Sequence, residues 1–215
     1  DFKRYQALLK FRNTLLEKKP HGLDLQLKAI DEEFVKTSLV LTKRRTMFLK
    51  EIEPYFRDAF KKIFSKDHNV SLYLETRLSH DEPNRLFKIL EENRLKDRSA
   101  KFTTYGVHKD DYVLLFDGMD SIDFCSLGQQ KMSYLSLLFA YIELFRYKIG
   151  SFPIVLMDDV SGELDKARWE NLVTYLGNGE FQTLITTANE AFRKELEKIK
   201  GTKKILVTSG LVKNL

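Results

Sequence analysis

Two adjacent carboxylates, Asp158 and Asp159, end a short apolar segment of the sequence. The four residues at 154–157 are all apolar and two are β-branched, which predicts a strand buried on both faces. Carboxylates at the C-terminal end of such a parallel strand lie where open α/β sheets bind ligands. Side chains alternate along a strand, so the two acids need not share a role. If the pair serves nucleotide hydrolysis, Asp158 would hold Mg²⁺ through water and Asp159 would position the attacking water. The alternative is a pair that only makes a turn or caps a helix.

A second group suited to phosphate lies at Ser126, Gly128 and Gln129, where a small-residue loop opens a helix predicted to begin near Gln129. The first N–H groups of a helix lack internal partners and carry partial positive charge, so a helix start with a glycine can accept a phosphate. Ser126 as a plain N-cap is the simpler alternative. A turn at 161–162 then leads to Glu163 and Asp165 and into a further helix.

The elements that must position these residues alternate between strand and helix. Strands are predicted at 112–116, 121–124, 154–157, 181–187 and 204–208, and helices from 129 onward and at 166–176 and 190–199. Asp117-Gly118 is a hairpin turn signal. This alternation predicts a largely parallel sheet with helices.

The N-terminal part of the sequence is mostly helical. Apolar residues at helical spacing predict helices at 2–19 and 23–65, separated by the Pro-His-Gly break at 20–22. No strict heptad persists, so we expect an antiparallel helical arm rather than a coiled coil. A strand at 70–76, a charged helix at 82–98 and a second strand at 101–105 are expected to complete this part.

Positive charge is concentrated in this arm. The whole chain has 215 residues and a net charge of +5 at pH 7, and residues 1–66 carry sixteen Lys/Arg against nine Asp/Glu. This part is therefore the better candidate for a nucleic-acid surface, with the run Lys43, Arg44 and Arg45 as possible phosphate contacts. The alternative is a solvated helix face.

The remaining chemical signals are weak. His108, Asp110 and Asp111 lack a second His or a Cys at zinc-ligand spacing, so they predict a structured turn that braces the nucleotide face rather than a metal site. The single cysteine, Cys125, excludes an internal disulfide and fits a reducing compartment. No run of eighteen apolar residues predicts a membrane span.

Several motifs together resemble one known family. Gly-Gln-Gln at 128–130 followed by L-M-D-D-V-S-G-E-L-D at 156–165 is similar to the signature and Walker B regions of ABC-type ATPase heads of the SMC kind, and most of all to the RecF family of bacterial recombination mediators. The segments that agree further are G-V-H-K-D-D at 106–111, with Val107 and Lys109 as departures from the family pattern, I-T-T-A-N at 185–189, V-T-S-G-L-V at 207–212, and F-R-N-T-L-L at 11–16. A G-x-x-x-x-G-K-[ST] loop is missing from the sequence, so we expect the C-terminal portion of such a protein, without the Walker A region.

The resemblance implies a fold and a set of roles. The fold would be α/β, the C-terminal half of an ABC/SMC-type ATPase head plus a mostly helical lobe, with residues 1–100 as the arm with a short strand pair and 101–215 as the head part. Asp158 would hold Mg²⁺ and Asp159 would be catalytic. Ser126, Gly128 and Gln129 would contact ATP bound by a partner head, with Glu163 and Asp165 at the dimer seam.

The same resemblance implies a cytoplasmic, nucleoid-associated DNA repair protein that acts at single-strand/double-strand junctions of gaps with RecR and RecO to load recombinase. The full-length protein would dimerise with ATP and be a weak DNA-dependent ATPase, whereas this chain alone would be inactive and bind no ATP or Mg²⁺. Two alternatives stay open: a non-catalytic module that binds DNA or protein, and another SMC-like head such as that of RecN.

Overall fold

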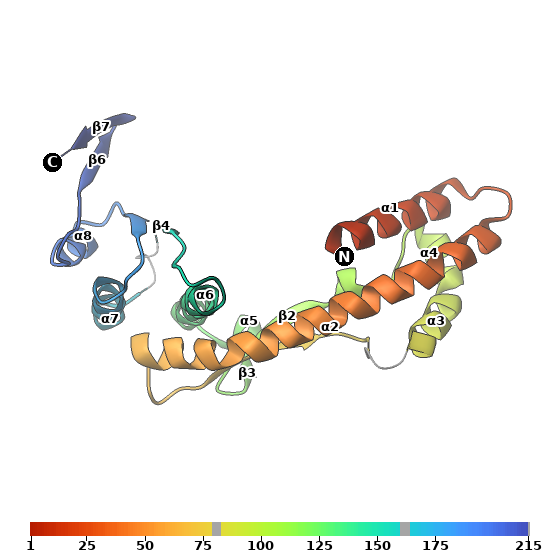
Figure 1. Cartoon of the computed structure of the whole chain (residues 1–215), viewed down its shortest axis with the longest axis horizontal. Coiled ribbons are helices and arrows are strands. Elements are labelled where there is room, and N and C mark those ends of the chain that lie inside the picture. Colours follow the sequence, from red (N-terminus) through yellow and green to blue (C-terminus); the bar gives the residue numbers. More distant parts are fainter. Residues whose placement is uncertain (79–82, 160–163, 215) are drawn as a thin grey trace. The chain divides into compact units, whose positions relative to one another are not determined.

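The computed structural model describes residues 1–78, 83–159 and 164–214 (Figure 1). The chain forms two compact units, and each is assembled from two stretches of sequence. Unit 1 comprises Asp1–Glu51 and Leu72–Val113, and unit 2 comprises Ile52–Ser71 and Leu114–Leu215. The division into residues 1–100 and 101–215 stays a prediction.

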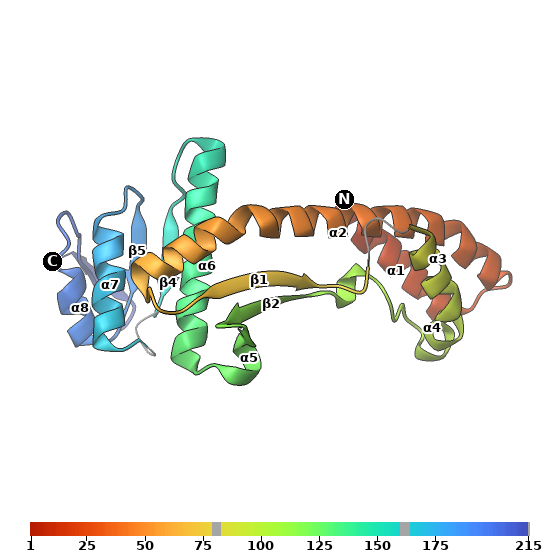
Figure 2. The same ribbon diagram turned by 90° about the horizontal axis from the view of Figure 1, so that it is seen from below.

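The helices of unit 1 follow the predicted periodicity. The first, α1 (Phe2–Lys18), ends where Lys19 adopts a left-handed conformation with φ of 47°, and its N–H donates to the Leu15 carbonyl. The second, α2 (Leu23–Ile63), returns alongside α1, and its residues from 52 onward belong to unit 2 (Figures 1 and 2). Pro54 lies inside α2 and removes one backbone donor without ending the helix. The expected helix at 82–98 is divided into α3 (Pro83–Glu92) and α4 (Arg94–Ala100).

An apolar cluster holds these helices together. Tyr5 of α1 stacks on Phe34 of α2 with ring centroids 5.1 Å apart, and Leu86 and Leu90 of α3 are buried in the same cluster. Both leucines lie on one face of α3, four residues apart. Burial of this stripe is the main contribution that α3 makes to stability.

A fully buried arginine adds a polar centre to unit 1. The Arg12 side chain has no exposed surface, and its guanidinium donates to Asp31 at 2.8 Å and to Asp97 at 2.7 Å. Arg94 donates to the second oxygen of Asp31 at 3.1 Å. The two arginines and two aspartates balance in charge and join α1, α2 and α4. Such a group is tolerated in a core because each charge is paired and hydrogen-bonded.

The predicted strand at 101–105 is wrong, and the network around Arg12 explains why. The N–H of Thr103 donates to the Asn13 side chain at 2.8 Å, and the N–H of Thr104 donates to Asp97 at 2.8 Å. These backbone donors are therefore used by side chains and are not available to a strand ladder. The segment is irregular, and the strand at 70–76 pairs elsewhere.

The sheet that contains this strand has the order β1-β2-β3, with β1 (Val70–Glu75), β2 (Asp111–Phe116) and β3 (Met119–Asp120). The hairpin between β2 and β3 is confirmed. Asp117 and Gly118 both have positive φ, 50° and 81°, as this tight turn requires. The strand predicted at 121–124 is wrong: these residues form the helical turn α5 (Ser121–Phe124), because the Asp120 side chain caps it at the Ile122 N–H.

Unit 2 carries the predicted alternation of helices and strands. Its elements after α5 are α6 (Leu127–Ile149), β4 (Val155–Asp158), α7 (Lys166–Gly177), β5 (Thr183–Thr186), α8 (Glu190–Leu196), β6 (Ile205–Thr208) and β7 (Leu211–Asn214). The strands β4 and β5 are parallel and pair Val155 with Thr183 through Asp158 with Thr186, whereas β6 and β7 form an antiparallel hairpin. The α/β fold is confirmed, with its parallel part formed by β4 and β5.

One face of β4 packs into unit 2 and the other does not. Val155 and Met157 are buried, whereas Leu156 is 73% exposed. Its neighbour in register, Leu184 of β5, is 50% exposed. The expectation of a strand buried on both faces is therefore wrong for this chain, because only the face toward the buried residues is covered. None of the helices in the described ranges combines the length and apolar character that crossing a bilayer requires.

Candidate functional site at the end of strand β4

The predicted carboxylates lie at the C-terminal end of the parallel strand pair. Asp158 is the last residue of β4 and is paired in register with Thr186, the last residue of β5. The alternation of burial along both strands leaves these two side chains on the exposed face. Parallel strands end at the same sheet edge, so two polar side chains from distant parts of the sequence meet there.

A hydrogen-bonded group joins both carboxylate residues to Thr186. The Thr186 hydroxyl donates to the Asp158 carboxylate. The same hydroxyl oxygen accepts from the Asp159 N–H at 3.2 Å, and the Thr186 carbonyl accepts from that N–H at 3.2 Å as well. Thr186 therefore fixes one Asp158 oxygen and anchors the backbone of the next residue.

Asp159 adopts an unusual backbone conformation. Its φ is 42°, in the left-handed region, which aspartate tolerates better than most residues that have a Cβ. This conformation ends the strand immediately after Asp158 and is held by the two bonds of the Asp159 N–H to Thr186.

This arrangement suits a hard cation such as Mg²⁺ that takes most of its ligands from water and phosphate oxygens. Asp158 keeps a second carboxylate oxygen beyond the one bonded to Thr186, and its side chain is exposed. Within residues 1–78, 83–159 and 164–214, no three His, Cys, Asp or Glu side chains gather to form a metal cage. Mg²⁺ is commonly held by one or two carboxylates together with water and phosphate oxygens, so the residues present fit that ion.

The loop before α6 forms a complete capping box. Ser126 accepts from the Gln129 N–H at 3.3 Å, and the Gln129 side chain accepts from the Ser126 N–H at 2.9 Å. The plain N-cap that the sequence allowed for Ser126 is therefore present, and α6 begins at Leu127, two residues earlier than expected. Gly128 lies in the first turn, and the Gln130 side chain ties the loop to α5 by donating to the Ser121 carbonyl at 2.8 Å.

The remaining predicted residues of this region lie around α7. Asp165 is the N-cap of α7, where its side chain accepts from the Arg168 N–H at 2.9 Å. It also forms an ion pair with the Arg168 guanidinium at 3.1 Å. Glu163 lies outside the described residues. The structure thus groups Asp158, Asp159 and Thr186 together, groups Ser126 with Gln129, and gives Asp165 a local role.

The three basic residues proposed for DNA on α2 have different surroundings. Lys43 is exposed, and Arg44 forms an exposed ion pair with Asp1 at 2.6 Å. Arg45 is mostly covered: it donates to the Val107 carbonyl at 2.8 Å and pairs with Asp110 at 3.4 Å. Arg45 therefore has a structural role in unit 1, and it contributes less to an open basic surface than the other two.

The turn around His108 is structured by contacts within unit 1, and its bracing of the nucleotide face stays a prediction. His108 Nε2 donates to the Thr103 carbonyl at 3.0 Å, so Nδ1 accepts from the Tyr5 hydroxyl at 2.7 Å. Burial lowers the pKa of His108, and burial raises the pKa of Asp110 against the opposing hydrogen bond from Thr76. Both shifts follow from enclosure within unit 1.

Sequence reasoning did not assign Thr186 a contact with Asp158. Thr186 and Thr187 belong to the segment I-T-T-A-N at 185–189, which indicates a strand but not its partner. The register of β5 against β4 is a non-local property and cannot be read from that segment. The available signal was the position of both residues at the ends of consecutive predicted strands, which in a parallel pair places them at one edge.

No family model matches the chain. A protein of Clostridium kluyveri named DNA replication and repair protein RecF is 34% identical over 187 residues, which is 85% of this chain and 50% of that protein. Proteins of the same name from Staphylococcus epidermidis and Clostridium botulinum are 31% and 30% identical over 88% and 100% of the chain.

The chain is similar to RecF proteins over 85–100% of its own length. It spans about half the length of the curated relatives it matches, between 50% and 59% for those named above. The predicted resemblance is thereby confirmed.

Solved structures agree on the fold. A structure of the recombination mediator protein RecF with ATP matches the whole chain with a TM-score of 0.79 at 24% identity and is covered over 57% of its length. An SMC ATPase structure matches 81% of the chain with a TM-score of 0.50 at 14% identity and is covered over 88%. The chain therefore has the fold of RecF and SMC-type ATPase heads.

Proposed function

We propose that this chain is part of a RecF-type DNA repair ATPase and supplies its Walker B and signature residues. The observation that carries the proposal is the group at the end of the parallel strands, where Thr186 holds Asp158 and the backbone of Asp159. The names of the relatives support the biological setting, since they are DNA replication and repair proteins and a recombination mediator bound to ATP.

Asp158 and Asp159 would divide the chemistry at this site. Bound Mg²⁺ would neutralise charge that develops on the transferred phosphate. Asp158, oriented by Thr186, would hold that ion through water, and Asp159 would position the attacking water and accept its proton. ATP would be bound mainly by a Walker A region, a motif that the present sequence does not contain.

The signature loop would act across a dimer. Ser126, Gly128 and Gln129 would face ATP bound by a second copy, and Glu163 with Asp165 would line the seam. Three apolar side chains near the loop support an interface there, since Ile122, Phe124 and Leu127 are 75%, 68% and 71% exposed. Apolar residues gathered at the surface within so short a stretch mark a surface that another molecule covers.

DNA binding would use the exposed basic residues of the arm. Lys43 and Arg44 are accessible for phosphate contacts, whereas Arg45 is engaged with Val107 and Asp110. The preferred ligand would be a single-strand/double-strand junction, with RecR and RecO as protein partners in loading recombinase. One neighbouring structure is described as part of the RecFOR pathway, which supports this setting.

The test is Asp159→Asn in the full-length protein that carries this sequence. The amide has nearly the shape of the carboxylate but cannot accept a proton, so DNA-stimulated ATP turnover is expected to fall by about 10²- to 10⁴-fold. ATP-dependent dimerisation, measured by sedimentation, should persist because the phosphate contacts are unchanged. Asp67→Asn, in the exposed segment between α2 and β1, is the control and should keep full turnover. Unreduced turnover in Asp159→Asn would remove Asp159 from the catalytic role.

A further inference from the structure

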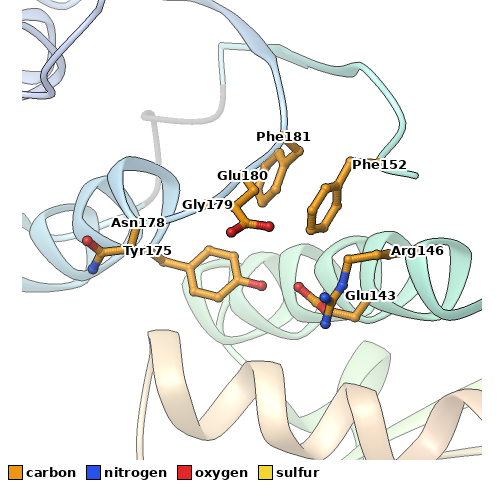
Figure 3. Close-up of a pocket in the computed structure, with 8 residues that line it drawn as sticks. All are labelled: Glu143, Arg146, Phe152, Tyr175, Asn178, Gly179, Glu180 and Phe181. Atoms are coloured by element: carbon orange, nitrogen blue, oxygen red, sulfur yellow. The ribbon is translucent and has the colours of Figure 1, made fainter. Parts of the chain in front are cut away.

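A pocket of about 270 Å³ lies where strands β4 and β5 begin, at the opposite strand ends from Asp158 and Thr186 (Figure 3). It is formed by the C-terminal parts of α6 and α7 and by the segments that lead into the two strands. The lining residues are Glu143, Arg146, Phe152, Tyr175, Asn178, Gly179, Glu180 and Phe181. The proposed nucleotide chemistry uses none of them.

Aromatic rings form much of the pocket wall. The Phe152 and Phe181 rings are 5.8 Å apart between centroids, and Tyr175 lies 6.4 Å from Phe181. Beneath them the fully buried Phe139 contacts the Tyr175 ring edge-on at 4.9 Å, which anchors the cluster in the core of unit 2. A Cβ on Gly179 would lie 2.6 Å from the Phe181 ring, so glycine there lets the ring occupy its place.

Carboxylates accompany these rings. Glu180 reaches over the pocket toward Tyr175 (Figure 3), its side chain is exposed, and it forms no ion pair within residues 1–78, 83–159 and 164–214. Glu143 lies on the opposite wall. Burial, with the carboxylates of Glu143 and Asp58, raises the pKa of Tyr175 to about 12, so its hydroxyl stays protonated and available as a donor.

Arg146 shows what kind of group this wall accepts. Its guanidinium lies 5.3 Å above the centre of the Phe152 ring and pairs with Glu143 at 3.1 Å. A cation is thus stacked on an aromatic face and bonded to a carboxylate at the pocket rim. Among the described residues, no cation pairs with Glu180 or lies over the Tyr175 and Phe181 rings, and the pocket lining holds two carboxylates against one guanidinium.

We propose that this pocket receives an arginine side chain from a partner protein. A guanidinium combines a flat surface that stacks on aromatic rings with donors that match the Glu180 carboxylate. The charge complementarity favours a cation over an anion, and the pocket volume suits one side chain rather than a folded surface. The inference is independent of the nucleotide site, because it rests on residues at the other end of the strands.

The probe is a pair of capped tripeptides, acetyl-Gly-Arg-Gly-amide and its citrulline counterpart, which has nearly the same shape without the charge. They are titrated into the chain labelled with ¹³C in its Phe and Tyr rings, and ring resonances are followed by NMR. The arginine peptide is expected to shift Phe152, Tyr175 and Phe181 with a dissociation constant on the order of 1–10 mM, since one side chain provides little contact area. The citrulline peptide should shift them at least about threefold less at equal concentration.

Two substitutions assign the recognising group. Glu180→Gln should weaken arginine binding by about three- to tenfold, because it removes the unpaired exposed carboxylate and changes no packing contact. Glu170→Gln is the control on α7: Glu170 forms only a weak exposed pair with Lys166 at 3.8 Å, and binding should be unchanged. Thermal unfolding of both variants verifies that the fold is kept.

Three results of the peptide titrations would overturn the proposal. The arginine and citrulline peptides could give equal shifts, the arginine peptide could shift none of the three rings, or Glu180→Gln could bind with full affinity. If the rings shift with protein concentration alone, the occupant is a second copy of this chain, and the assignment to a different partner protein is wrong.

Discussion

The polar groups around Arg12 and those around Thr186 use similar side chains for different purposes. Arg12 and Asp97 have no exposed side-chain surface, and their bonds join helices within unit 1. Asp158 and Thr186 are exposed at the ends of β4 and β5. A buried charged group is retained only if its partners satisfy it, whereas an exposed one can keep capacity for a ligand.

The apolar residues of the two regions differ in the same way. The cluster around Phe34 in unit 1 is enclosed by α1, α2 and α3. In unit 2, Leu156 and Leu184 lie side by side on the open face of the parallel pair, although the sequence predicts residues 154–157 as a strand buried on both faces. Residues of one type therefore stabilise the fold in one region and present a surface in the other, so composition alone does not distinguish the two roles.

The largest effect is expected from Arg12→Ala. Removal of this side chain leaves the buried Asp97 without its cation and Asp31 with Arg94 alone, which should lower the free energy of unfolding by about 3–5 kcal/mol. Hydrogen exchange of the α1 and α4 amides measures the loss directly in unit 1.

Arg98→Ala is the matched control for this prediction. Arg98 and Asp24 form an ion pair at 3.3 Å with side chains 40% and 59% exposed, so the cost should stay within about 0.5 kcal/mol. Equal losses of protection in the two variants would contradict the view that the Arg12 network holds unit 1 together.

A smaller effect separates the N-cap role of Ser126 from the ATP-facing role that we propose for it. Ser126→Ala removes the N-cap of α6 and should lower the free energy of unfolding by about 1 kcal/mol, whereas Ser126→Asp keeps a capping oxygen and the stability. In the full-length protein, Ser126→Asp should nevertheless abolish ATP-dependent dimerisation, because its charge opposes a phosphate. Thermal unfolding and sedimentation with ATP measure the two properties. Normal dimerisation of Ser126→Asp would mean that Ser126 is only a cap.

Local features of the sequence were sufficient for much of this fold. The helical spacing at 2–19 and 23–65, the Asp117-Gly118 turn and the strand before Asp158 are each determined by residues close in sequence. The position of the two carboxylates at a parallel strand end also followed from such local patterns.

Several features that the sequence did not predict depend on contacts between residues far apart in the sequence. Residues 101–105 have strand-like composition, but Asn13 and Asp97 take their backbone donors. The contact between Thr186 and Asp158 depends on strand register, and the exposure of Leu156 depends on which elements cover the sheet. None of these can be read from a short window of sequence.

The smallest predicted effect concerns the pH dependence of unit 1. Burial lowers the folded-state pKa of His108, so between that value and the ordinary value near 6.5 the unfolded chain binds more protons than the folded one. Stability is therefore fully present above about pH 6.5 and declines as the pH falls toward the folded pKa. The raised pKa of Asp110 acts oppositely, since its contribution is lost as the pH rises from about 3.9 through the folded value.

Urea unfolding followed by circular dichroism between about pH 7.5 and pH 5.5 separates the two groups, because His108 titrates over this range in the unfolded chain. The wild type should lose stability across it, and His108→Gln should lose less, since its side chain cannot take up a proton. His21→Gln is the control: His21 is exposed before α2, and its replacement should keep the wild-type slope. If the pH dependence of stability is the same in His108→Gln as in the wild type, protonation of His108, which is hydrogen-bonded to Tyr5 and Thr103, is not coupled to folding.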